Sequence, residues 1–459
     1  MDAVEEIKRR IDPVAYIGRF VRLQKTGRNF RGLCPFHSER TPSFYVFPER
    51  GTWRCFGACG EGGDLFTFVQ KREGVGFREA LELLAREAGV PLQHESPERR
   101  ERRERLAALV SAAVAFYQAQ LAGPAGEQAR RYLEVERGLS AETVAAWKLG
   151  WAPDEWRALR DHLAARGYGE DDMVRAGLLV QPEDGGAPYD RFRGRIIFPI
   201  ADERGVFVAL AGRILGAGEP KYLNSPQTEL FDKGRLLFGL DKAAGAIRDE
   251  GTAVVVEGYM DVIGPWQAGF RNVVATMGTA LTVEHARLLR RYARRVVLAM
   301  DPDAAGLAAA ERAGEALLGL SDVLRLARST RAAERLTQAA DVELYVAPLP
   351  PGVDPDEVAR RSPERWRQAI AEAVPYPAFA LDRALAGGRP ATPHELREAI
   401  ARVVPILLAV RSPVEQARYI QRAARLLATD ERYLLDEYRS ARRQLMLQVA
   451  KESRQRAAT

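Results

Sequence analysis

Cysteine is scarce in this chain. Its 459 residues include three cysteines, and all of them lie between positions 34 and 59. A set that is odd in number and so tightly grouped fits a metal site better than a framework of disulfides.

Long apolar runs are missing as well. No stretch reaches the roughly 18 consecutive apolar residues that a transmembrane helix needs. The amino-terminal segment MDAVEEIKRRIDPVAYIGRF lacks the apolar core of a signal peptide. The motif G-x4-G-K-[ST] is also absent, so a P-loop ATPase or helicase domain is not expected. We therefore expect a cytoplasmic protein without a membrane partner.

What is present indicates a large globular chain. A length of 459 residues is too great for one compact core, so two to four domains are expected. Hydrophobic residues make up 46% of the chain and charged residues 28%, with a net charge of +6. This balance permits binding to a polyanion such as a nucleic acid, but does not require it.

The three cysteines belong to a segment with the spacing of a zinc site. Cys34 and His37 form a C-x2-H pair, and Cys55 and Cys59 form a C-x3-C pair. Two such pairs at the ends of short hairpins give a tetrahedral site with no open position, which indicates structural rather than catalytic zinc. The alternative is three ordinary buried thiols beside a chance histidine, but every cysteine lies in this one stretch.

Aromatic residues and arginines alternate in the same segment. The aromatic residues are Phe36, Phe44, Tyr45, Phe47, Trp53 and Phe56, and the arginines are Arg31, Arg40, Arg50 and Arg54. Aromatic faces beside arginines could stack unpaired bases and contact phosphates. For any single aromatic residue, a place in the small core of the segment is the competing interpretation.

The rest of the chain divides by its hydrophobic patterns. Residues 65–90 have helical periodicity, and the charged run that follows is a linker or a solvated helix. Strand-like runs begin near residue 190, and apolar strands alternate with helices between 250 and 350. That alternation predicts a parallel, helix-flanked sheet. We expect a multidomain α/β and α+β fold with parts at 1–98, 106–245, 250–366 and 372–450, the last of them helical.

Six carboxylates follow the apolar strands of the third part. They are Glu257, Asp261, Asp301, Asp303, Asp354 and Asp356. Ligands of parallel sheets bind at the carboxyl ends of the strands. Carboxylates gathered there repel one another unless cations are bound, and oxygen ligands alone select Mg²⁺ or Mn²⁺. Two such ions suit displacement at phosphorus. For one Asp-Pro-Asp pair alone, capping of a helix is the simpler interpretation, but the whole set favours metal.

Several motifs together resemble one family. CPFH, CFG and CGEGGD are similar to its zinc domain, and RFRGRIIFPI and PKYLNSPQTELFDKGRLLFGL are similar to its polymerase core. VVVEGYMDVI, MGTALT, DPDAAG and DPDE are similar to its Toprim subdomain. The chain therefore resembles a bacterial replicative DNA primase of the DnaG type. The resemblance implies a zinc-ribbon DNA-binding domain, the amino-terminal subdomain of a polymerase core, a Toprim metal-binding subdomain and a helical subdomain, in that order.

The family synthesises short RNA primers on single-stranded DNA from ribonucleoside triphosphates. By resemblance, the main catalytic metal ligands are Glu257, Asp301 and Asp303, with Asp261, Asp354 and Asp356 in support. The nucleotide- or DNA-binding residues implied are Arg193, Arg195, Arg213, Lys221, Asn224 and Lys233. The cofactors implied are one structural zinc ion and catalytic Mg²⁺ or Mn²⁺, and the replicative helicase is the expected protein partner.

The chain departs from the family pattern in four places. The second cysteine pair has one residue more than usual, Pro302 stands where the family has glycine, and a basic helical insertion is expected around 322–341. The family also carries a carboxyl-terminal domain that docks the helicase, and we expect this domain to be absent. Two other functions stay open: a Toprim-type nuclease or topoisomerase, and a catalytically silent zinc-containing scaffold that binds DNA.

Overall fold

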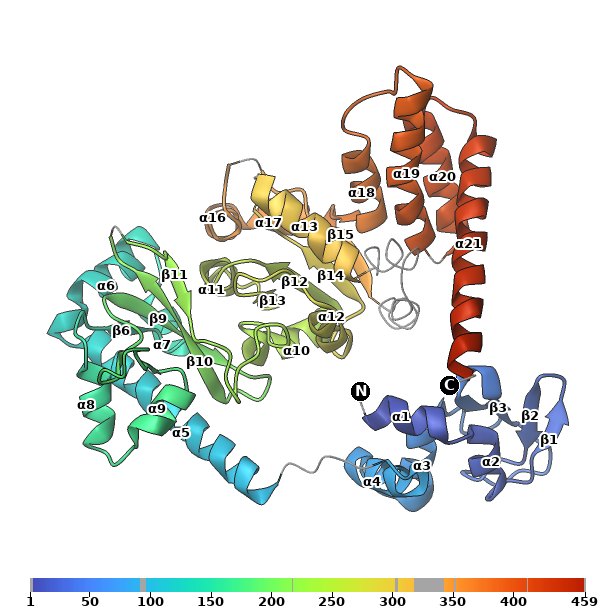
Figure 1. Ribbon diagram of the computed structural model, residues 1–459, viewed down its shortest axis with the longest axis horizontal. Helices are drawn as coiled ribbons and strands as arrows, with labels where there is room; N and C mark the ends of the chain where they lie inside the picture. The colour runs from blue at the N-terminus through green and yellow to red at the C-terminus, as the bar shows by residue number, and fades with distance from the viewer. Residues whose placement is uncertain are drawn as a thin grey trace. The chain divides into compact units, whose positions relative to one another are not determined.

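The structure is a computed structural model of the chain, and it describes residues 3–90, 96–216, 218–301, 304–317, 342–350, 352–410 and 412–457. The chain divides into two compact units, Met1–Arg100 and Glu101–Thr459. Figure 1 shows the elements of both.

The first unit is built on a five-stranded antiparallel sheet of order β1-β2-β3-β4-β5. Its elements are α1 (Ala3–Arg10), α2 (Pro13–Gly18), β1 (Gln24–Thr26), β2 (Asn29–Gly32), β3 (Phe44–Phe47), η1 (Pro48–Arg50), β4 (Thr52–Cys55), β5 (Gly62–Asp64), α3 (Leu65–Glu73) and α4 (Phe77–Ala88). Strand β3 buries Phe44 and Val46 and leaves the alternate residues partly exposed, as the two-residue period of a strand requires. The buried residues pack against the apolar sides of α3 and α4.

The second unit begins with a long helix and an antiparallel sheet. The elements of this half are α5 (Pro97–Ala122), η2 (Pro124–Gly126), α6 (Glu127–Arg131), η3 (Tyr132–Glu136), α7 (Ala141–Ala146), β6 (Gly150–Ala152), α8 (Ala158–Ala164), α9 (Glu170–Arg175), β7 (Leu179–Val180), β8 (Tyr189–Asp190), β9 (Arg195–Ala201), β10 (Phe207–Ile214) and β11 (Tyr222–Asn224). The main sheet has the order β11-β10-β9-β6. Every residue of β9 is buried, so this strand forms the centre of the sheet.

Helix α5 contains the charged run that the sequence analysis left as a linker or a solvated helix. Among the described helices, it is the one long and apolar enough to cross a membrane by length and composition. Its apolar residues, however, belong to the main core of the second unit; they include Leu106, Leu109, Val110, Val114 and Tyr117. A core helix passes the same test of length and composition, and these contacts identify α5 as one.

The Toprim-like part is a parallel sheet flanked by helices. Its elements are α10 (Leu240–Glu250), β12 (Thr252–Val256), α11 (Met260–Gln267), β13 (Val273–Ala275), α12 (Val283–Arg290), β14 (Arg295–Leu298), α13 (Ala304–Leu317), β15 (Glu343–Val346), α16 (Pro355–Arg361), α17 (Pro363–Ala371) and β16 (Val374–Pro375). The strand order is β13-β12-β14-β15-β16, and all pairs are parallel except that of the edge strand β16. The predicted parallel sheet and fold class are confirmed.

Four helices complete the described chain: α18 (Tyr376–Ala384), α19 (Pro393–Ala409), α20 (Pro413–Leu427) and α21 (Glu431–Ala457). Buried residues of α18–α21, such as Leu407 and Leu434, share one hydrophobic cluster with Val255 and Leu298 of the parallel sheet. The Tyr376 hydroxyl also donates to the Glu311 carbonyl of α13 at 3.0 Å. These contacts attach the helices to the sheet.

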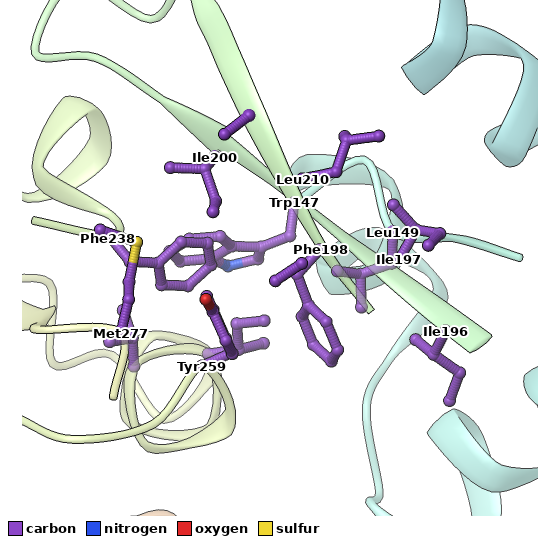
Figure 2. Packing of buried hydrophobic residues seen from close by; sticks show 14 of the residues in the cluster. Trp147, Leu149, Ile196, Ile197, Phe198, Ile200, Leu210, Phe238, Tyr259 and Met277 are labelled. Atoms are coloured by element: carbon purple, nitrogen blue, oxygen red, sulfur yellow. The ribbon is translucent and has the colours of Figure 1, made fainter. Parts of the chain in front are cut away.

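The antiparallel and parallel sheets of the second unit share a core. Figure 2 shows Trp147, Phe198, Phe238 and Tyr259 packed together in it. The Tyr259 ring stacks on Phe198 at 5.3 Å and meets Phe238 edge-on at 4.9 Å, distances between ring centroids. Because Tyr259 comes directly before α11, this packing fixes the start of the segment that carries Asp261.

Candidate functional site

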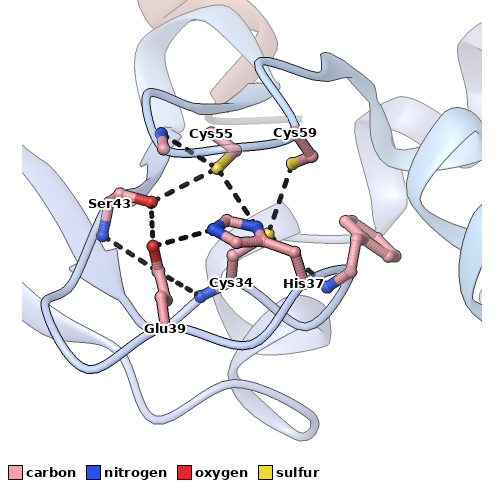
Figure 3. A network of polar contacts seen from close by, with 8 residues as sticks. Cys34, His37, Glu39, Ser43, Cys55 and Cys59 are labelled. Atoms are coloured by element: carbon pink, nitrogen blue, oxygen red, sulfur yellow. Dashed lines mark hydrogen bonds and ion pairs between the residues drawn. The ribbon is translucent and has the colours of Figure 1, made fainter.

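Four potential metal ligands of the first unit converge at one point. The ligand atoms of Cys34, His37, Cys55 and Cys59 all lie within 4.8 Å of one another. Figure 3 shows Cys55 and Cys59 on one loop and Cys34 and His37 on another, with the imidazole between the sulfurs. The extra residue of the C-x3-C pair is taken up by a turn in which the Gly60 N–H donates to the Gly57 carbonyl.

The geometry of this cluster fits zinc. Tetrahedral zinc with Zn–S bonds of about 2.3 Å places two sulfurs roughly 3.8 Å apart. The Cys34 and Cys59 sulfurs are 3.7 Å apart, and Cys55 Sγ is 3.9 Å from His37 Nδ1. Backbone N–H groups of Phe36 and Gly57 point at two of the sulfurs, at 3.5 and 3.2 Å. Such donors stabilise thiolates in structural zinc sites.

Glu39 and Ser43 complete the site, and the sequence analysis did not name them. Glu39 Oε2 is 3.1 Å from His37 Nε2 and accepts from the Ser43 hydroxyl at 2.5 Å, while Oε1 accepts from the Cys34 N–H at 2.7 Å. Burial alone would raise the pKa of Glu39, but the bonds from Ser43 and Cys34 lower it. A carboxylate on Nε2 leaves Nδ1 facing the sulfurs, the usual support of a histidine ligand. Its position two residues after His37 is the signal that could have identified it.

The aromatic residues of the same unit divide into two groups. Phe44 and Trp53 are buried and stack at 5.2 Å, so they belong to the core. Phe56, at 62% exposed, lies at the surface with the Arg54 guanidinium over its ring. A pocket of about 540 Å³ opens beside it; its lining residues are Phe47, Arg50, Thr52, Trp53, Arg54, Phe56, Gly60, Gly62 and Gly63.

Carboxylates of the second unit follow neighbouring strands at the carboxyl edge of the parallel sheet. Glu257 directly follows β12, and Asp301 lies three residues beyond the end of β14. The two strands are neighbours, with Val255 opposite Leu298, so both carboxylates leave the same edge. Asp261 lies in the first turn of α11.

Asp261 is the centre of this charge cluster. Burial, together with the negative charges of Asp301, Asp356 and Asp354, raises the pKa of the Asp261 carboxyl to about 7. The Asp356 N–H donates to Asp261 Oδ1 at 3.4 Å. Gly258 gives the carboxylate its room, because a Cβ there would lie 2.5 Å from Asp261 Oδ2. Carboxylates concentrated in this way, without nitrogen or sulfur ligands, fit a divalent cation.

The second Asp-Pro-Asp pair occupies two different environments. Asp354 is exposed at the N-cap of α16 and makes no side-chain capping bond. Asp356 is 2% exposed, and its Oδ2 contacts Arg360 Nη2 at 3.2 Å and Arg137 Nη1 at 3.8 Å. Its carboxylate is thus held by two guanidinium groups that the sequence analysis did not name. Asp303 lies outside the described residues, as do 318–341, which include the expected insertion.

Three of the basic candidates are available at the surface or beside it. Lys221 is exposed just before β11. Arg213, on β10, lies over the Tyr132 ring at 4.4 Å. Lys233 is half-buried in the loop between β11 and α10, and within the described part of the chain its ammonium group has no hydrogen bond or ion pair.

Arg193 and Arg195 of the RFRGR motif make different contacts. Arg195 is 6% exposed, and its Nη1 donates to the Pro220 and Gly212 carbonyls at 2.9 and 3.3 Å. Its guanidinium therefore fixes the chain just before Lys221. Arg193 lies over the exposed Trp156 ring at 4.2 Å and the Tyr189 ring at 5.0 Å.

Asn224 connects the two sheets of the second unit. Its Oδ1 accepts from the Tyr259 hydroxyl at 2.6 Å, and its Nδ2 donates to the Met277 carbonyl at 3.1 Å. Met277 has a φ of 61°, an uncommon conformation for a residue with a side chain. The amide thus holds the end of β11 beside the turn that follows β13.

Sequence models of four families match the chain, and the descriptions of two of them name primase. They are the CHC2 zinc finger at residues 1–100, the N-terminal domain of the DNA primase catalytic core at 116–244, the Toprim domain at 251–327 and the DnaB-helicase binding domain of primase at 377–432. The Aquifex aeolicus primase structure, with its zinc-binding and RNA polymerase domains, is 30% identical, with a TM-score of 0.56 over 95% of this chain and 99% of that one. The chain belongs to the DnaG-type DNA primase family.

Two further primases support the assignment. The DNA primase of Halalkalibacterium halodurans is 42% identical over 375 residues, which are 80% of this chain and 59% of that protein. A DnaG primase catalytic domain bound to single-stranded DNA is 32% identical, with a TM-score of 0.62 over 73% of this chain and 99% of that one. The chain thus spans about three fifths of the length of the curated primases that it matches.

The primase family model at 377–432 corrects one prediction. The prediction that the helicase-docking domain is absent is wrong. The matched residues are the helices α18, α19 and α20 and the start of α21. The mistake came from judging this helical region by its length, although apolar periodicity shared by many helical subdomains does not distinguish one that docks a helicase.

The primase family also specifies the cofactors. Its CHC2 zinc finger carries structural zinc, and the four ligand atoms described above fit that ion. Its Toprim domain works with divalent metal ions, which the oxygen-only cluster around Asp261 fits.

Proposed function

We propose that this chain is a DNA primase that synthesises short RNA primers on single-stranded DNA, joining ribonucleotides by metal-dependent nucleotidyl transfer. The observation that supports this most is the carboxylate cluster at the edge of the parallel sheet, where burial and three neighbouring carboxylates raise the pKa of Asp261. The structure of a similar DnaG primase catalytic domain has been solved bound to single-stranded DNA. The reaction would take place at the replication fork in the bacterial cytoplasm.

In this proposal the six carboxylates have different roles at the metal site. The metal ligands are Glu257, Asp301 and Asp303, supported by Asp261, Asp354 and Asp356. When bound, divalent ions polarise the α-phosphate and stabilise the pyrophosphate leaving group. Asp356 would act indirectly, because two arginines hold its carboxylate while its N–H holds Asp261.

The basic residues would bind the substrates. Lys221, Lys233 and Arg213 would neutralise a triphosphate and the template backbone. Arg193, with its aromatic neighbours, would contact the template. Arg195 and Asn224 make their described bonds within the protein, so they would shape the site by holding β11 and the chain before it.

Synthesis without a primer tests the proposal. The purified chain is incubated with single-stranded DNA, labelled ribonucleoside triphosphates and Mg²⁺, beside Asp301→Asn and the control Asp436→Asn. Asp436 is an exposed carboxylate of α21, with an ion pair to Arg439. We expect short RNA products from the wild type and from Asp436→Asn, and none from Asp301→Asn. Cleaved or relaxed DNA in place of RNA would favour a Toprim nuclease or topoisomerase, and DNA binding without any chemistry would favour the scaffold.

We further propose that Cys34, His37, Cys55 and Cys59 hold one zinc ion. Metal analysis of the wild type should give about one zinc per chain, and Cys55→Ser should reduce that content. A first unit that folds without metal would overturn this assignment.

Residues 377–432 would dock the replicative helicase. The description of the matching family model supports this partner. Val414, which is 73% exposed on α20, gives a test site. Val414→Glu should weaken capture of the helicase in a pull-down and leave unassisted primer synthesis unchanged. Equal capture of the helicase by the wild type and by Val414→Glu would show that this face of α20 does not bind it.

A further inference from the structure

The first turn of α12 is bonded to the loop that carries Lys233. The Thr282 hydroxyl donates to the Gly234 carbonyl at 2.6 Å. His285 Nε2 lies 2.9 Å from the Lys233 carbonyl and 3.0 Å from the Leu236 carbonyl. The contacts therefore reach three carbonyls of one irregular loop, from residues about 50 positions later in the chain.

The bonds of the imidazole define its protonation. His285 Nδ1 accepts from the Thr282 N–H at 3.1 Å, so the ring proton is on Nε2, where it faces the two loop carbonyls. The side chain is 0% exposed, and burial lowers its pKa, which keeps the ring neutral near pH 7. His285 thus caps α12 with one nitrogen and holds the loop with the other.

Buried side chains anchor the two ends of this loop, because Phe231 is 0% exposed and Leu237 is 1% exposed. Residues 231–237 form no helix or strand, and a pair of backbone bonds between Phe238 and Ala275 follows them. The Asp232 side chain accepts from the Gly234 N–H and so bonds only within the loop. Between the two buried ends, the described hydrogen bonds that reach residues 232–236 from outside the loop are those of Thr282 and His285, and they hold the backbone at Lys233.

We propose that His285 is a positioning residue that fixes Lys233 for binding the phosphates of a nucleotide or template. This rests on the proposed function, in which Lys233 is a substrate-binding cation. His285 does not touch the substrate. It acts through the carbonyl of the residue that does.

Two substitutions separate the two tasks of the ring. His285→Gln can accept from the Thr282 N–H with its carbonyl and donate to the loop with its amide, as imidazole does. His285→Glu keeps the acceptor that a capping box needs, but it offers lone pairs to the loop carbonyls where a donor is required. We expect the KM for ribonucleoside triphosphates to rise about tenfold to a hundredfold in His285→Glu, with kcat changed less, and to stay near the wild-type value in His285→Gln.

Trypsin gives a readout that does not depend on activity. It cleaves after Lys233 and Arg235, both in the loop, and a released loop is cleaved faster. We expect faster cleavage at these two positions in His285→Glu than in the wild type or in His285→Gln. Cleavage elsewhere in the chain serves as the internal reference.

The outcomes distinguish the inference from the function on which it rests. A lower melting temperature in His285→Glu with unchanged KM and unchanged cleavage would make His285 merely structural and overturn the inference. In a Lys233→Ala background, the further change from His285→Glu should no longer raise KM. If the wild type makes no primers, the proposed function fails. The trypsin experiment still tests the inference in that case, because equal cleavage of His285→Glu and His285→Gln would show that His285 does not hold the loop.

Discussion

Gly258 controls the geometry of the carboxylate edge from within the backbone. A Cβ at this position would lie 2.5 Å from Asp261 Oδ2, too close for any side chain. We expect Gly258→Ala to displace the Asp261 carboxylate and reduce primer synthesis about a hundredfold, with a stability loss of about 1–3 kcal/mol. Steady-state synthesis and denaturant unfolding measure the two effects.

Gly245 on α10 is the matched control for that substitution. A Cβ there meets nothing within 4 Å, so Gly245→Ala should keep full activity and leave stability equal or slightly higher. Equal activity of Gly258→Ala and Gly245→Ala would show that the position of the Asp261 carboxylate does not matter for catalysis.

Asp354 and Asp356 differ by burial, although the sequence presents them as a pair. Asp356→Asn leaves Arg137 and Arg360 without a counter-charge beside a nearly inaccessible group, and we expect a loss of about 3 kcal/mol in unfolding free energy. The exposed Asp354→Asn should change stability by less than about 0.5 kcal/mol. Denaturant titration of both variants compares them, and similar losses would contradict this division.

The residue types of the site could be predicted from the sequence, but their partners could not. Cys34 and His37 are close in the chain, and carboxylates after apolar strands give a local pattern. The ion pair of Arg137 with Asp356, by contrast, joins residues that are far apart in sequence. No local periodicity encodes such a contact, because it depends on how α16 packs beside the segment that follows η3.

Helix α12 makes the chain sensitive to acid. The buried His285 has a pKa below its usual value of 6.5 because of burial, while its hydrogen bonds to the Lys233 and Leu236 carbonyls, and then the nearby charges of Glu284 and Asp232, partly offset the shift. The unfolded chain therefore takes up a proton first as the pH falls, and the unfolding free energy contributed by His285 is lost below about pH 6.5. The wild type should lose more stability than His285→Gln between about pH 7.5 and pH 5.5.

Denaturant midpoints of the wild type and of His285→Gln, measured over the same series of pH values, check this loss of stability. Their difference isolates His285 from the other titrating groups, since those are common to both chains. Midpoints that fall equally in both chains would mean that the ring does not titrate in this range.

At the level of elements, apolar runs were the reliable signal. Strands β12, β13, β14 and β15 follow runs that alternate with helical patterns, and the sheet is parallel, as predicted. Helix α5 was harder to predict from its sequence, because its first turns are charged and its remainder is apolar. One continuous helix therefore combines two patterns. The carboxyl-terminal helices show most clearly what sequence periodicity cannot predict, since it indicates a helix but not the protein that the helix binds.

The two units of the chain should respond differently to metal removal. The core of the first unit includes Cys34 and Cys55, so the metal site and the fold are one structure there. Structural zinc contributes about 10–16 kcal/mol in small zinc domains, comparable to the whole stability of a domain. A chelator should therefore unfold Met1–Arg100 while leaving the thermal transition of Glu101–Thr459 in place.

Calorimetry with and without chelator measures this, and Cys55→Ser should reproduce the chelator's effect. A single transition that moves as a whole on metal removal would show that the units do not unfold independently.

The stacking of Tyr259 on Phe198 also affects how the chain folds while the ribosome synthesises it. Phe198 lies in the centre of the antiparallel sheet, but its covering ring belongs to a segment about 60 residues later, which a bacterial ribosome takes roughly 3–12 s to add. During that interval, one face of a nearly complete sheet is exposed to other nascent chains. Substitutions that slow closure of this face should therefore reduce the yield of protein from cells before they change the activity of the molecules that do fold.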